Sequence, residues 1–440
     1  MTSSRTPMKQ RINVGIIGLG TVGTGAVRIL TENAELIRQR AGVPIVVKRV
    51  AVRDLKRDRG VVLPAGVLTN DPSTIVADPE IDIVVELIGG YQPAKELILE
   101  AFARGKHVVT ANKALLASDG AEIQTAASRA GVMIGFEGSV GGGIPVIKAV
   151  RESLAGNRIV SIYGIINGTS NYILTKMTDE DRSFLDVLAE AQRAGYAEAD
   201  PTFDVEGIDT AHKLAILVNL AFGVHVQLEQ VYTEGISRLS PLDIDFGREF
   251  GYRLKLLAIA KHHEKTIETR VHPTMVPEEY PIAKVSGVYN AIQIVGDACE
   301  DIMLYGRGAG SMPTGSAVVG DIMDISRQIL LEPSRHLPLM ERKEPLAIQS
   351  MDSITSIYYL RFMVLDEPGV LSQISGILGR HRISIAQVIQ RGRKLGGAVP
   401  LVVMTHTAIE RDVQNALVEI KNLACVSEEP VLIRVEGEEL

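Results

Sequence analysis

Short hydrophobic runs alternate with amphipathic stretches through the first third of the chain. Five of these runs are typical of buried strands, and they cover residues 12–17, 46–52, 81–88, 107–110 and 132–136. Between the first two runs, hydrophobic residues recur at helical spacing. Strands that alternate with helices of this length predict βαβ units and a parallel sheet.

The pattern changes after Glu137. A glycine-rich segment at 138–143 leads into longer helices and strands without the βαβ rhythm, as far as about residue 298. Glycines return at 306–310 and precede a predicted helix at about 316–331. Residues 332–352 carry three prolines among mixed charges, which is typical of a linker.

The last part of the chain predicts the order βαββαβ, which is a ferredoxin-like arrangement. Its predicted elements are strands at 358–364, 383–390, 399–405 and 431–435, with helices at about 370–380 and 411–422. We therefore expect an α/β protein with a Rossmann-type nucleotide-binding domain, an α+β domain and a ferredoxin-like domain. The expected boundaries are 11–136 together with about 306–331, then 137–305, a linker at 332–352, and 353–436.

The composition and charge of the chain exclude several classes of function. The 440 residues correspond to about three domains. With 46 Lys and Arg against 53 Asp and Glu, the net charge of −7 provides no basic surface for nucleic acid or an anionic membrane. The two cysteines, Cys299 and Cys425, are too few for a disulfide framework or a thiolate metal site. Neither a signal peptide nor a membrane span is evident, so we expect a cytoplasmic protein.

A glycine-rich turn follows the first predicted strand. Gly18, Gly20 and Gly23 form the pattern G-x-G-x-x-G, and Thr21 and Val22 begin the predicted helix. The first glycine allows a tight turn, the second lets the backbone approach a pyrophosphate, and the third allows close packing of helix and strand. Because the helix N-terminus also attracts phosphate, the turn predicts dinucleotide binding.

The end of the second predicted strand bears on the choice of dinucleotide. An acidic residue there accepts hydrogen bonds from the ribose hydroxyls of NAD, whereas an arginine suits the 2′-phosphate of NADP. The chain offers Arg53 and then Asp54, with Lys56 and Arg57 just beyond. The basic excess favours NADP, and NAD stays a possible cofactor.

Two lysines are candidates for chemistry. Lys113 comes just after the strand at 107–110, where ligands of parallel sheets bind, although most lysines simply lie on the surface. Lys213 follows a segment with no helical periodicity before about Ile208, and it shares one helix face with Asp209. That segment carries five carboxylates, at Glu198, Asp200, Asp204, Glu206 and Asp209. A lysine held among them could serve as a general acid, or it could form an ordinary surface ion pair.

Six motifs together resemble homoserine dehydrogenase: GLGTVG, ELIGG, TANK, FEGSVGGGIP, NGTSNYIL and GYAEADPTFDVEGIDTAHK. The last part of the chain resembles an ACT domain. The resemblance implies interconversion of L-homoserine and L-aspartate 4-semialdehyde with NAD(P), on the route to threonine, methionine and isoleucine.

The resemblance also implies roles for single residues. Lys213 matches the proton donor and Asp209 its positioning partner. Lys113 matches a lysine that contacts cofactor and substrate, and the division of proton transfer between the two lysines stays open. Glu198 and Asp204 match residues that bind the substrate amino group.

A structural sodium ion is implied at the glycine-rich segment, held by the side chain of Glu137 and by backbone carbonyls at Val140, Gly142 and Ile144. Oxygen ligands suit such a cation, and close packing is the other explanation for these glycines. The segment at 306–310 resembles a return segment that closes against the nucleotide-binding domain. The middle domain resembles one that dimerises, so we expect a homodimer or homotetramer.

The ACT resemblance implies L-threonine as a feedback effector, bound near the loop from Asp366 to Gly369. A dimerisation module without a ligand is the alternative. Other functions that fit the sequence are a different Rossmann amino-acid dehydrogenase and a non-enzymatic nucleotide or amino-acid sensor. Lys113, Glu198, Asp209 and Lys213 argue against the sensor.

Overall fold

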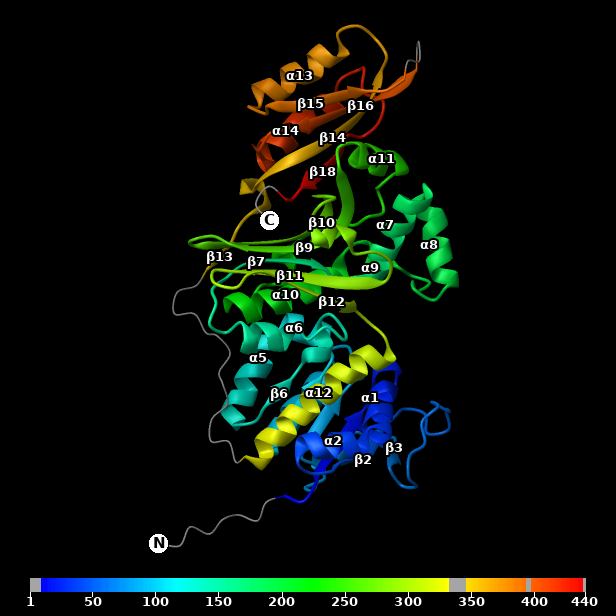
Figure 1. Ribbon diagram of the computed structural model, residues 1–440, viewed down its shortest axis with the longest axis vertical. Coiled ribbons are helices and arrows are strands. Elements are labelled where there is room, and N and C mark those ends of the chain that lie inside the picture. Colours follow the sequence, from blue (N-terminus) through cyan, green and yellow to red (C-terminus); the bar gives the residue numbers. More distant parts are fainter. Residues whose placement is uncertain (1–8, 332–345, 393–396, 438–440) are drawn as a thin grey trace. The chain divides into compact units, whose positions relative to one another are not determined.

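A computed structural model describes residues 9–331, 346–392 and 397–437, and it divides the chain into two compact units. Within the described residues, unit 1 comprises 9–159, 212–229 and 290–331, and unit 2 comprises 160–211, 230–289, 346–392 and 397–437. Most of the expected linker, at 332–345, lies outside the described residues. Figure 1 labels the elements along the chain.

Unit 1 contains the predicted parallel sheet. Its strand order is β3-β2-β1-β4-β5-β6, and each neighbouring pair is parallel. The strands are β1 (Ile12–Ile17), β2 (Ile45–Ala51), β3 (Leu68–Thr69), β4 (Ile83–Glu86), β5 (His107–Thr110) and β6 (Ile134–Gly135). The strand order reverses direction between β1 and β4, which is where open parallel sheets bind their ligands.

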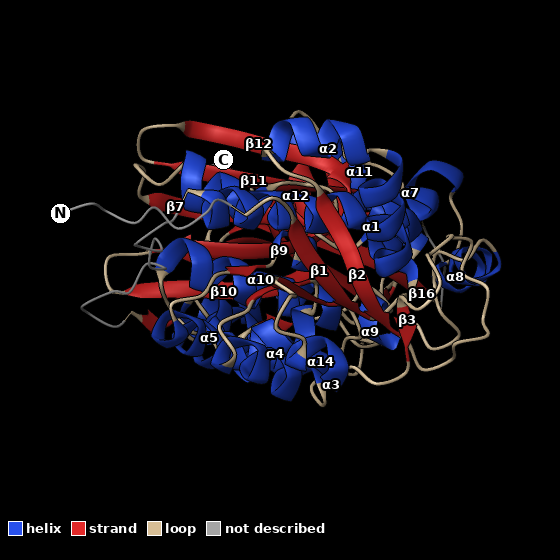
Figure 2. Ribbon diagram, turned by 90° about the horizontal axis from the view of Figure 1, so that it is seen from below, coloured by secondary structure: helices blue, strands red, loops and turns tan. Residues whose placement is uncertain are grey.

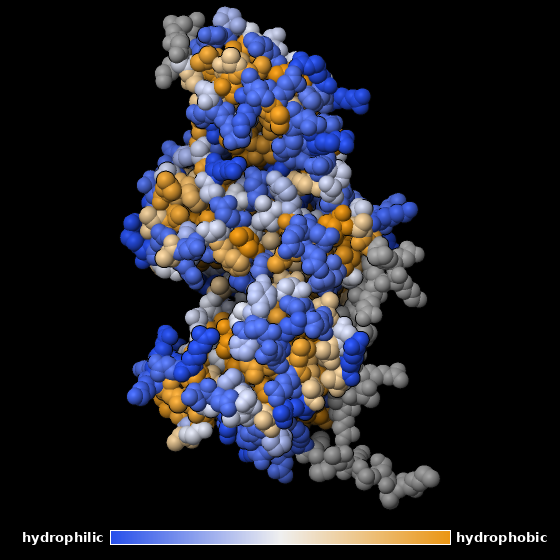
Figure 3. Space-filling model, turned by 180° about the vertical axis from the view of Figure 1, so that it is seen from behind, coloured by the Kyte–Doolittle hydropathy of each residue, from blue (hydrophilic) through white to orange (hydrophobic). Residues whose placement is uncertain are grey.

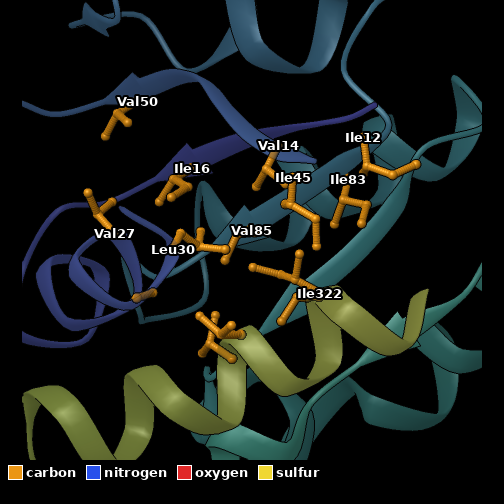
Figure 4. Close-up of a cluster of buried hydrophobic side chains, with 14 of the residues drawn as sticks. Ile12, Val14, Ile16, Val27, Leu30, Ile45, Val50, Ile83, Val85 and Ile322 are labelled. Carbon is orange, nitrogen blue, oxygen red and sulfur yellow. The ribbon is translucent and has the colours of Figure 1, made fainter. Parts of the chain in front are cut away.

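Helices cover both faces of this sheet. One face carries α1 (Thr21–Glu32), α2 (Ala34–Ala41) and α12 (Ser311–Leu330), and the other carries α3 (Ser73–Ala77), α4 (Ala94–Ala103) and α5 (Lys113–Ala130) (Figure 2). Successive strand residues point to opposite faces. Ile83 and Val85 of β4 therefore pack towards α1 and α12 (Figure 4), whereas Val84 packs towards α4 and α5. Burial on both faces explains why the strands are hydrophobic runs and show no alternation.

Helix α12 returns from late in the sequence to lie beside α1 (Figure 1). It begins at Ser311, five residues before the predicted start, because Pro313 is tolerated in the first turn of a helix. A Cβ added to Gly25 would collide with the Ser311 carbonyl oxygen, and one added to Gly315 would lie 2.7 Å from the Ala26 backbone nitrogen. The two helices thus meet backbone to backbone.

The rest of unit 1 comprises a hairpin and several short elements. The hairpin strands are β11 (Tyr289–Gly296) and β12 (Glu300–Arg307), and they are neighbours in one sheet. The glycine-rich segment leads into the short helix α6 (Val146–Lys148). Helix α10 (Ile208–Phe222) follows the carboxylate-rich segment; its residues from 212 onwards belong to unit 1, and Lys213 lies in its second turn.

Unit 2 is built on a sheet whose strands follow the order β7-β9-β10-β18-β14-β16-β15. Its first three strands are β7 (Ile159–Ile165), β9 (Tyr252–His262) and β10 (Thr266–Pro277), and short strands β8 (Tyr232–Thr233) and β13 (Ala347–Ile348) pair with β10. Its helices before the C-terminal domain are α7 (Gly168–Glu180), α8 (Phe184–Arg193), α9 (Thr202–Val205) and α11 (Pro241–Glu249).

The predicted order βαββαβ is confirmed in the C-terminal part. It comprises β14 (Thr355–Leu365), α13 (Val370–Arg380), β15 (Ile385–Gln390), β16 (Ala398–Thr405), α14 (Glu410–Lys421) and β18 (Val431–Val435), with the short strand β17 (Ala408–Ile409) before α14. Strand β18 also pairs in parallel with β10, through Thr274 with Arg434 and Met275 with Val435. The C-terminal sheet is therefore continuous with the sheet of β9 and β10.

Among the described residues, every helix is too short or too polar to cross a membrane. On the face drawn in Figure 3, hydrophilic side chains separate the hydrophobic patches from one another.

The contact between α1 and α12 predicts a local stability effect. Replacing Gly25 with alanine places a methyl group against the Ser311 carbonyl, so we expect the free energy of unfolding to fall by about 1–3 kcal/mol. Gly120 in α5 is a matched control, since nothing lies within 4 Å of an added Cβ. Gly120→Ala should leave stability unchanged or raise it by up to about 1 kcal/mol. Chemical denaturation measures the free energy of unfolding of both variants. Equal values for Gly25→Ala and Gly120→Ala would refute the close contact between α1 and α12.

Candidate active site

The glycine turn before α1 has the geometry of a phosphate site. Gly18 has φ +106°, and a Cβ there would lie 2.7 Å from the Leu87 carbonyl oxygen. A Cβ on Gly23 would collide with the Gly18 carbonyl, so this glycine allows α1 to approach β1. Around Gly20, by contrast, nothing lies within 4 Å. The structure thus leaves the middle of the turn open to a ligand, at the N-terminus of α1 that begins with Thr21.

Arg53 and Asp54 follow β2, as predicted, and both are exposed. One carboxylate oxygen of Asp54 accepts a hydrogen bond from the Lys56 backbone nitrogen at 2.8 Å. The Arg59 guanidinium donates to the Asp54 carbonyl at 2.8 Å. Asp54 is therefore engaged in a local turn, and Arg53, Lys56 and Arg57 form an exposed basic group beside it.

Lys113 is the first residue of α5, and its surroundings are fixed by buried hydrogen bonds. Asn112 caps the helix by accepting from the Leu115 backbone nitrogen at 3.2 Å. The Asn112 backbone nitrogen donates to the Thr110 hydroxyl at 3.0 Å, and that hydroxyl donates to the fully buried Glu86 at 2.7 Å. Lys113 itself is half-buried at the carboxyl end of β5.

The glycine-rich segment contains a buried carboxylate at Glu137. Its two oxygens accept from the backbone nitrogens of Ile147 at 2.8 Å and Lys148 at 2.9 Å. Burial raises the pKa of Glu137 above its ordinary value, against the opposing effect of these two hydrogen bonds. The Glu137 backbone nitrogen donates to Asp321, and burial raises the pKa of Asp321 to about 7.

The backbone near Glu137 folds tightly. Gly142 has φ +58°, and a Cβ there would lie 2.5 Å from the Gly308 carbonyl group, so the segment packs directly on the glycines at 306–310. Val140 and Ile144 are buried, and the Ile144 carbonyl accepts from Val146 at 2.8 Å. The three sequence-predicted backbone positions thus lie in one compact loop.

Two of the predicted carboxylates meet at a side chain to which the sequence assigned no role. The Asn167 amide nitrogen donates to Asp204 at 2.7 Å and to Asp209 at 2.9 Å. The Asn167 amide oxygen caps α7 by accepting from the Ser170 backbone nitrogen at 2.8 Å. An asparagine between a strand and a helix signals a cap, but nothing in the local sequence signals that its amide bridges two distant acids.

Asp204 lies in α9, a helix of four residues that periodicity could not reveal, because so short a helix completes barely one turn. The lack of helical periodicity before about Ile208 therefore gave no sign of the helix at residues 202–205. The Ser170 hydroxyl donates to the Asp204 backbone carbonyl at 3.0 Å. Both the side chain and the backbone of Asp204 are thus held by the N-terminal end of α7.

Asp209 and Lys213 lie one turn apart on α10 and are only 2 % and 8 % exposed. Their burial agrees with the apolar character of this helix. Glu198, in contrast, is exposed, and its backbone carbonyl accepts from the Gln192 side chain at 3.1 Å. The structure therefore brings Asp204 and Asp209 together through Asn167, while Glu198 lies on the surface near the end of α8.

Comparisons with known proteins decide the family. The family model described as homoserine dehydrogenase matches residues 145–323, and the one described as its NAD-binding domain matches 18–137. The ACT domain model matches 358–425. The homoserine dehydrogenase of Pseudomonas aeruginosa is 48 % identical over 97 % of this chain and 99 % of its own.

The chain belongs to the homoserine dehydrogenase family.

Solved structures agree with this assignment. A homoserine dehydrogenase from Thiobacillus denitrificans superimposes with a TM-score of 0.91 at 49 % identity, covering 97 % of this chain and 98 % of that one. A hyperthermophilic archaeal homoserine dehydrogenase in complex with NADPH has a TM-score of 0.63 at 26 % identity, covering 75 % of this chain and 100 % of that one.

The protein is thus a homoserine dehydrogenase-family oxidoreductase with a nicotinamide-nucleotide domain and a C-terminal ACT domain. This replaces the two alternatives left open by the sequence, a different amino-acid dehydrogenase and a non-enzymatic sensor.

The Asn167 bridge predicts how this homoserine dehydrogenase responds to its loss. Asn167→Ala leaves two neighbouring carboxylates without their shared donor, so we expect kcat/KM for homoserine to fall by about 10²-fold. Dinucleotide affinity should not change. Ser183→Ala is the control, because it removes the cap of α8 without touching either acid. Steady-state kinetics with homoserine tests this, and activity within threefold of the wild type would contradict it.

Proposed function

We propose that the chain catalyses the reversible, NADPH-dependent reduction of L-aspartate 4-semialdehyde to L-homoserine, with Lys213 as the proton donor. The observation that carries this proposal is the buried arrangement on α10. Asp209, held by Asn167, lies one turn before Lys213, and Asp204 shares the same amide. A lysine fixed on a helix beside carboxylates can remain protonated and deliver that proton to a nearby oxygen.

Each residue has a distinct task in this mechanism. Bound reduced nicotinamide would supply the hydride to the aldehyde carbon. Lys213 gives a proton to the carbonyl oxygen as the hydroxyl forms, and Asp209 orients the lysine. Asp204 and Glu198 bind the substrate ammonium, and Lys113 contacts cofactor and substrate. Because Asp204 is held at both its side chain and its backbone, it can orient an ammonium group at little entropic cost.

NADP is the proposed cofactor. Support comes from the exposed basic group of Arg53, Lys56 and Arg57 after β2, and from the engagement of Asp54 in a local turn. A 2′-phosphate carries negative charge and forms charge-assisted hydrogen bonds with arginine. The archaeal family member in complex with NADPH also favours this choice. NAD remains usable, because the glycine turn recognises the pyrophosphate that both cofactors share.

A structural sodium ion is proposed at the glycine-rich segment. Its ligands would be Glu137 and the carbonyls of Val140, Gly142 and Ile144, all oxygen donors of the kind that hard cations prefer. The raised pKa of Glu137 reflects a buried carboxylate whose ionised form a cation would stabilise. The ion would fix the loop that packs on Gly308, and it would take no part in the reaction.

The ACT domain is proposed to bind L-threonine as a feedback effector, in an enzyme that supplies threonine, methionine and isoleucine. Support comes from the exposed loop residues Glu367 to Gly369, which lie at the start of α13, because the first turn of a helix presents backbone N–H groups that can donate to a carboxylate. We also propose that the enzyme is a homodimer or homotetramer.

The proton donor can be tested directly. Lys213→Ala should lower kcat for homoserine oxidation by about 10²–10⁴-fold, because the residue that donates the proton in reduction must accept it in oxidation, and a positioned acid–base group contributes that much. The dissociation constant for NADPH should stay within twofold of the wild type. Lys176→Ala is a control that removes a lysine from an ion pair with Glu180 on α7. If kcat falls less than tenfold with cofactor binding intact, the role passes to Lys113.

Cofactor preference has its own test. Arg53→Ala removes the proposed partner of the 2′-phosphate, so we expect KM for NADPH to rise about tenfold or more while KM for NADH stays within twofold. Arg129→Ala, at the exposed end of α5, controls for loss of a positive charge. An equal change for both cofactors would show that Arg53 does not read the phosphate.

A further inference from the structure

An arginine of the ACT domain reaches out of that domain. Arg434 in β18 is 1 % exposed, and its Nε and Nη2 donate to Glu410 of α14 at 2.8 and 2.5 Å. Its remaining nitrogen, Nη1, donates to Glu234 at 3.0 Å, and Nη2 also lies 3.3 Å from the Tyr232 hydroxyl. One guanidinium therefore joins two ACT elements to the segment around β8.

The segment at 232–236 forms a strap along β10. Tyr232 and Thr233 pair in parallel with β10, and the Glu234 backbone nitrogen donates to the Val271 carbonyl at 2.8 Å. The Tyr232 hydroxyl donates to Glu234 at 3.0 Å. The Arg434 guanidinium also lies 5.0 Å from the centre of the Tyr232 ring. The strap is thus held by β10 on one side and by Arg434 on the other.

The strap in turn supports the turn at 205–207. The Ile236 backbone nitrogen donates to the Val205 carbonyl at 2.8 Å. Gly235 packs so closely on this turn that a Cβ would lie 2.6 Å from both the Val205 carbonyl oxygen and the Glu206 Cα. This turn directly follows Asp204 and directly precedes α10, which carries Asp209 and Lys213.

A cavity lies between the strap and the ACT domain, beside the ion pair of Arg434 and Glu234. Its volume is about 880 Å³, and it is lined by residues of both sides, including Glu206, Glu234, Leu417, Val431 and Arg434. Along this cavity, open space replaces side-chain contacts that would otherwise help to hold the strap against the ACT domain. The hydrogen bonds from Arg434 to Glu234 and Tyr232 cross from the ACT domain to the strap beside this cavity.

We propose that Arg434 is a positioning residue for the dehydrogenase reaction, acting through Glu234 and the strap on the turn that orients Asp204. This inference rests on the proposed role of Asp204 in binding the substrate ammonium. A shift of β18 or α14 in the ACT domain would move the strap and change the affinity for homoserine, while the affinity for NADPH should stay the same. The expected signature is an effect on KM for the amino-acid substrate alone.

The decisive experiment compares two arginine-to-lysine variants in the full-length enzyme. Arg434→Lys cannot keep the two-pronged pair with Glu410 together with the bonds to Glu234 and Tyr232, because all three lysine donors lie on one nitrogen, whereas the arginine donors are spread over three nitrogens in a planar fork. Arg361→Lys is the matched control, since Arg361 in β14 is also buried and makes a two-pronged pair with Asp243 of α11 at 2.6 and 3.1 Å. We expect Arg434→Lys to raise KM for homoserine about fivefold or more, and Arg361→Lys to leave it within twofold.

Glu234→Gln is a second variant, which removes the charge of Glu234 and keeps the size of its side chain. The Glu234 side chain is 36 % exposed, so its neutral replacement should fold. We expect the same rise in KM, with the dissociation constant for NADPH unchanged. The double variant Arg434→Lys with Glu234→Gln should be no worse than either single one, because both remove one interaction.

Several outcomes would overturn the proposal. KM unchanged in both Arg434→Lys and Glu234→Gln would make the pair purely structural, and an equal rise in Arg361→Lys would show that any disturbance of the domain junction suffices. The activity of the wild type in the same assay distinguishes failure of the proposed function from failure of the proposed role of Arg434. An inactive wild type refutes the proposed function, whereas an active wild type with unaffected variants refutes only the role of Arg434.

Discussion

The side-chain amide of Asn167 is the contact on which the candidate site depends. Two neighbouring carboxylates, the buried Asp209 and the half-buried Asp204, repel each other and lose hydration, so a donor that both share stabilises them. Asn167 supplies it, because its nitrogen bonds Asp204 and Asp209 while its oxygen caps α7. One side chain thus ties the start of α7 to α9 and to the first turn of α10, where Lys213 follows.

The same principle recurs at the junction of the ACT domain with the rest of unit 2. Buried arginines pair there with carboxylates: Arg361 with Asp243, Arg270 with Glu436, and Arg434 with Glu410 of its own domain and with Glu234 of the strap. Although burial alone would raise the pKa of Glu410, the hydrogen bonds and charge of Arg434 hold it below its ordinary value. Such pairs add little net stability compared with apolar packing, but breaking one is costly. They therefore determine how β18 sits beside β10 more than how tightly it binds.

Features with a local signature were predictable from the sequence. The glycine turn, five of the six strands of the parallel sheet and the βαββαβ order follow from spacing and periodicity, and the placement of Lys113 follows from the end of a strand. Asn167, Arg434 and the pairing of β10 with β18 were not predictable, because each joins residues far apart in the sequence. Short elements such as α9 could not be predicted for a different reason, since a single helical turn shows no periodicity.

The central claim is that Asp204 and Lys213 act on the same small molecule. A crystal structure of the enzyme with NADP and L-homoserine tests it most directly. The account predicts the Lys213 amine within about 3.2 Å of the homoserine hydroxyl oxygen, and a carboxylate oxygen of Asp204 at the same distance from the ammonium group. A complex in which ordered homoserine contacts neither side chain would contradict it.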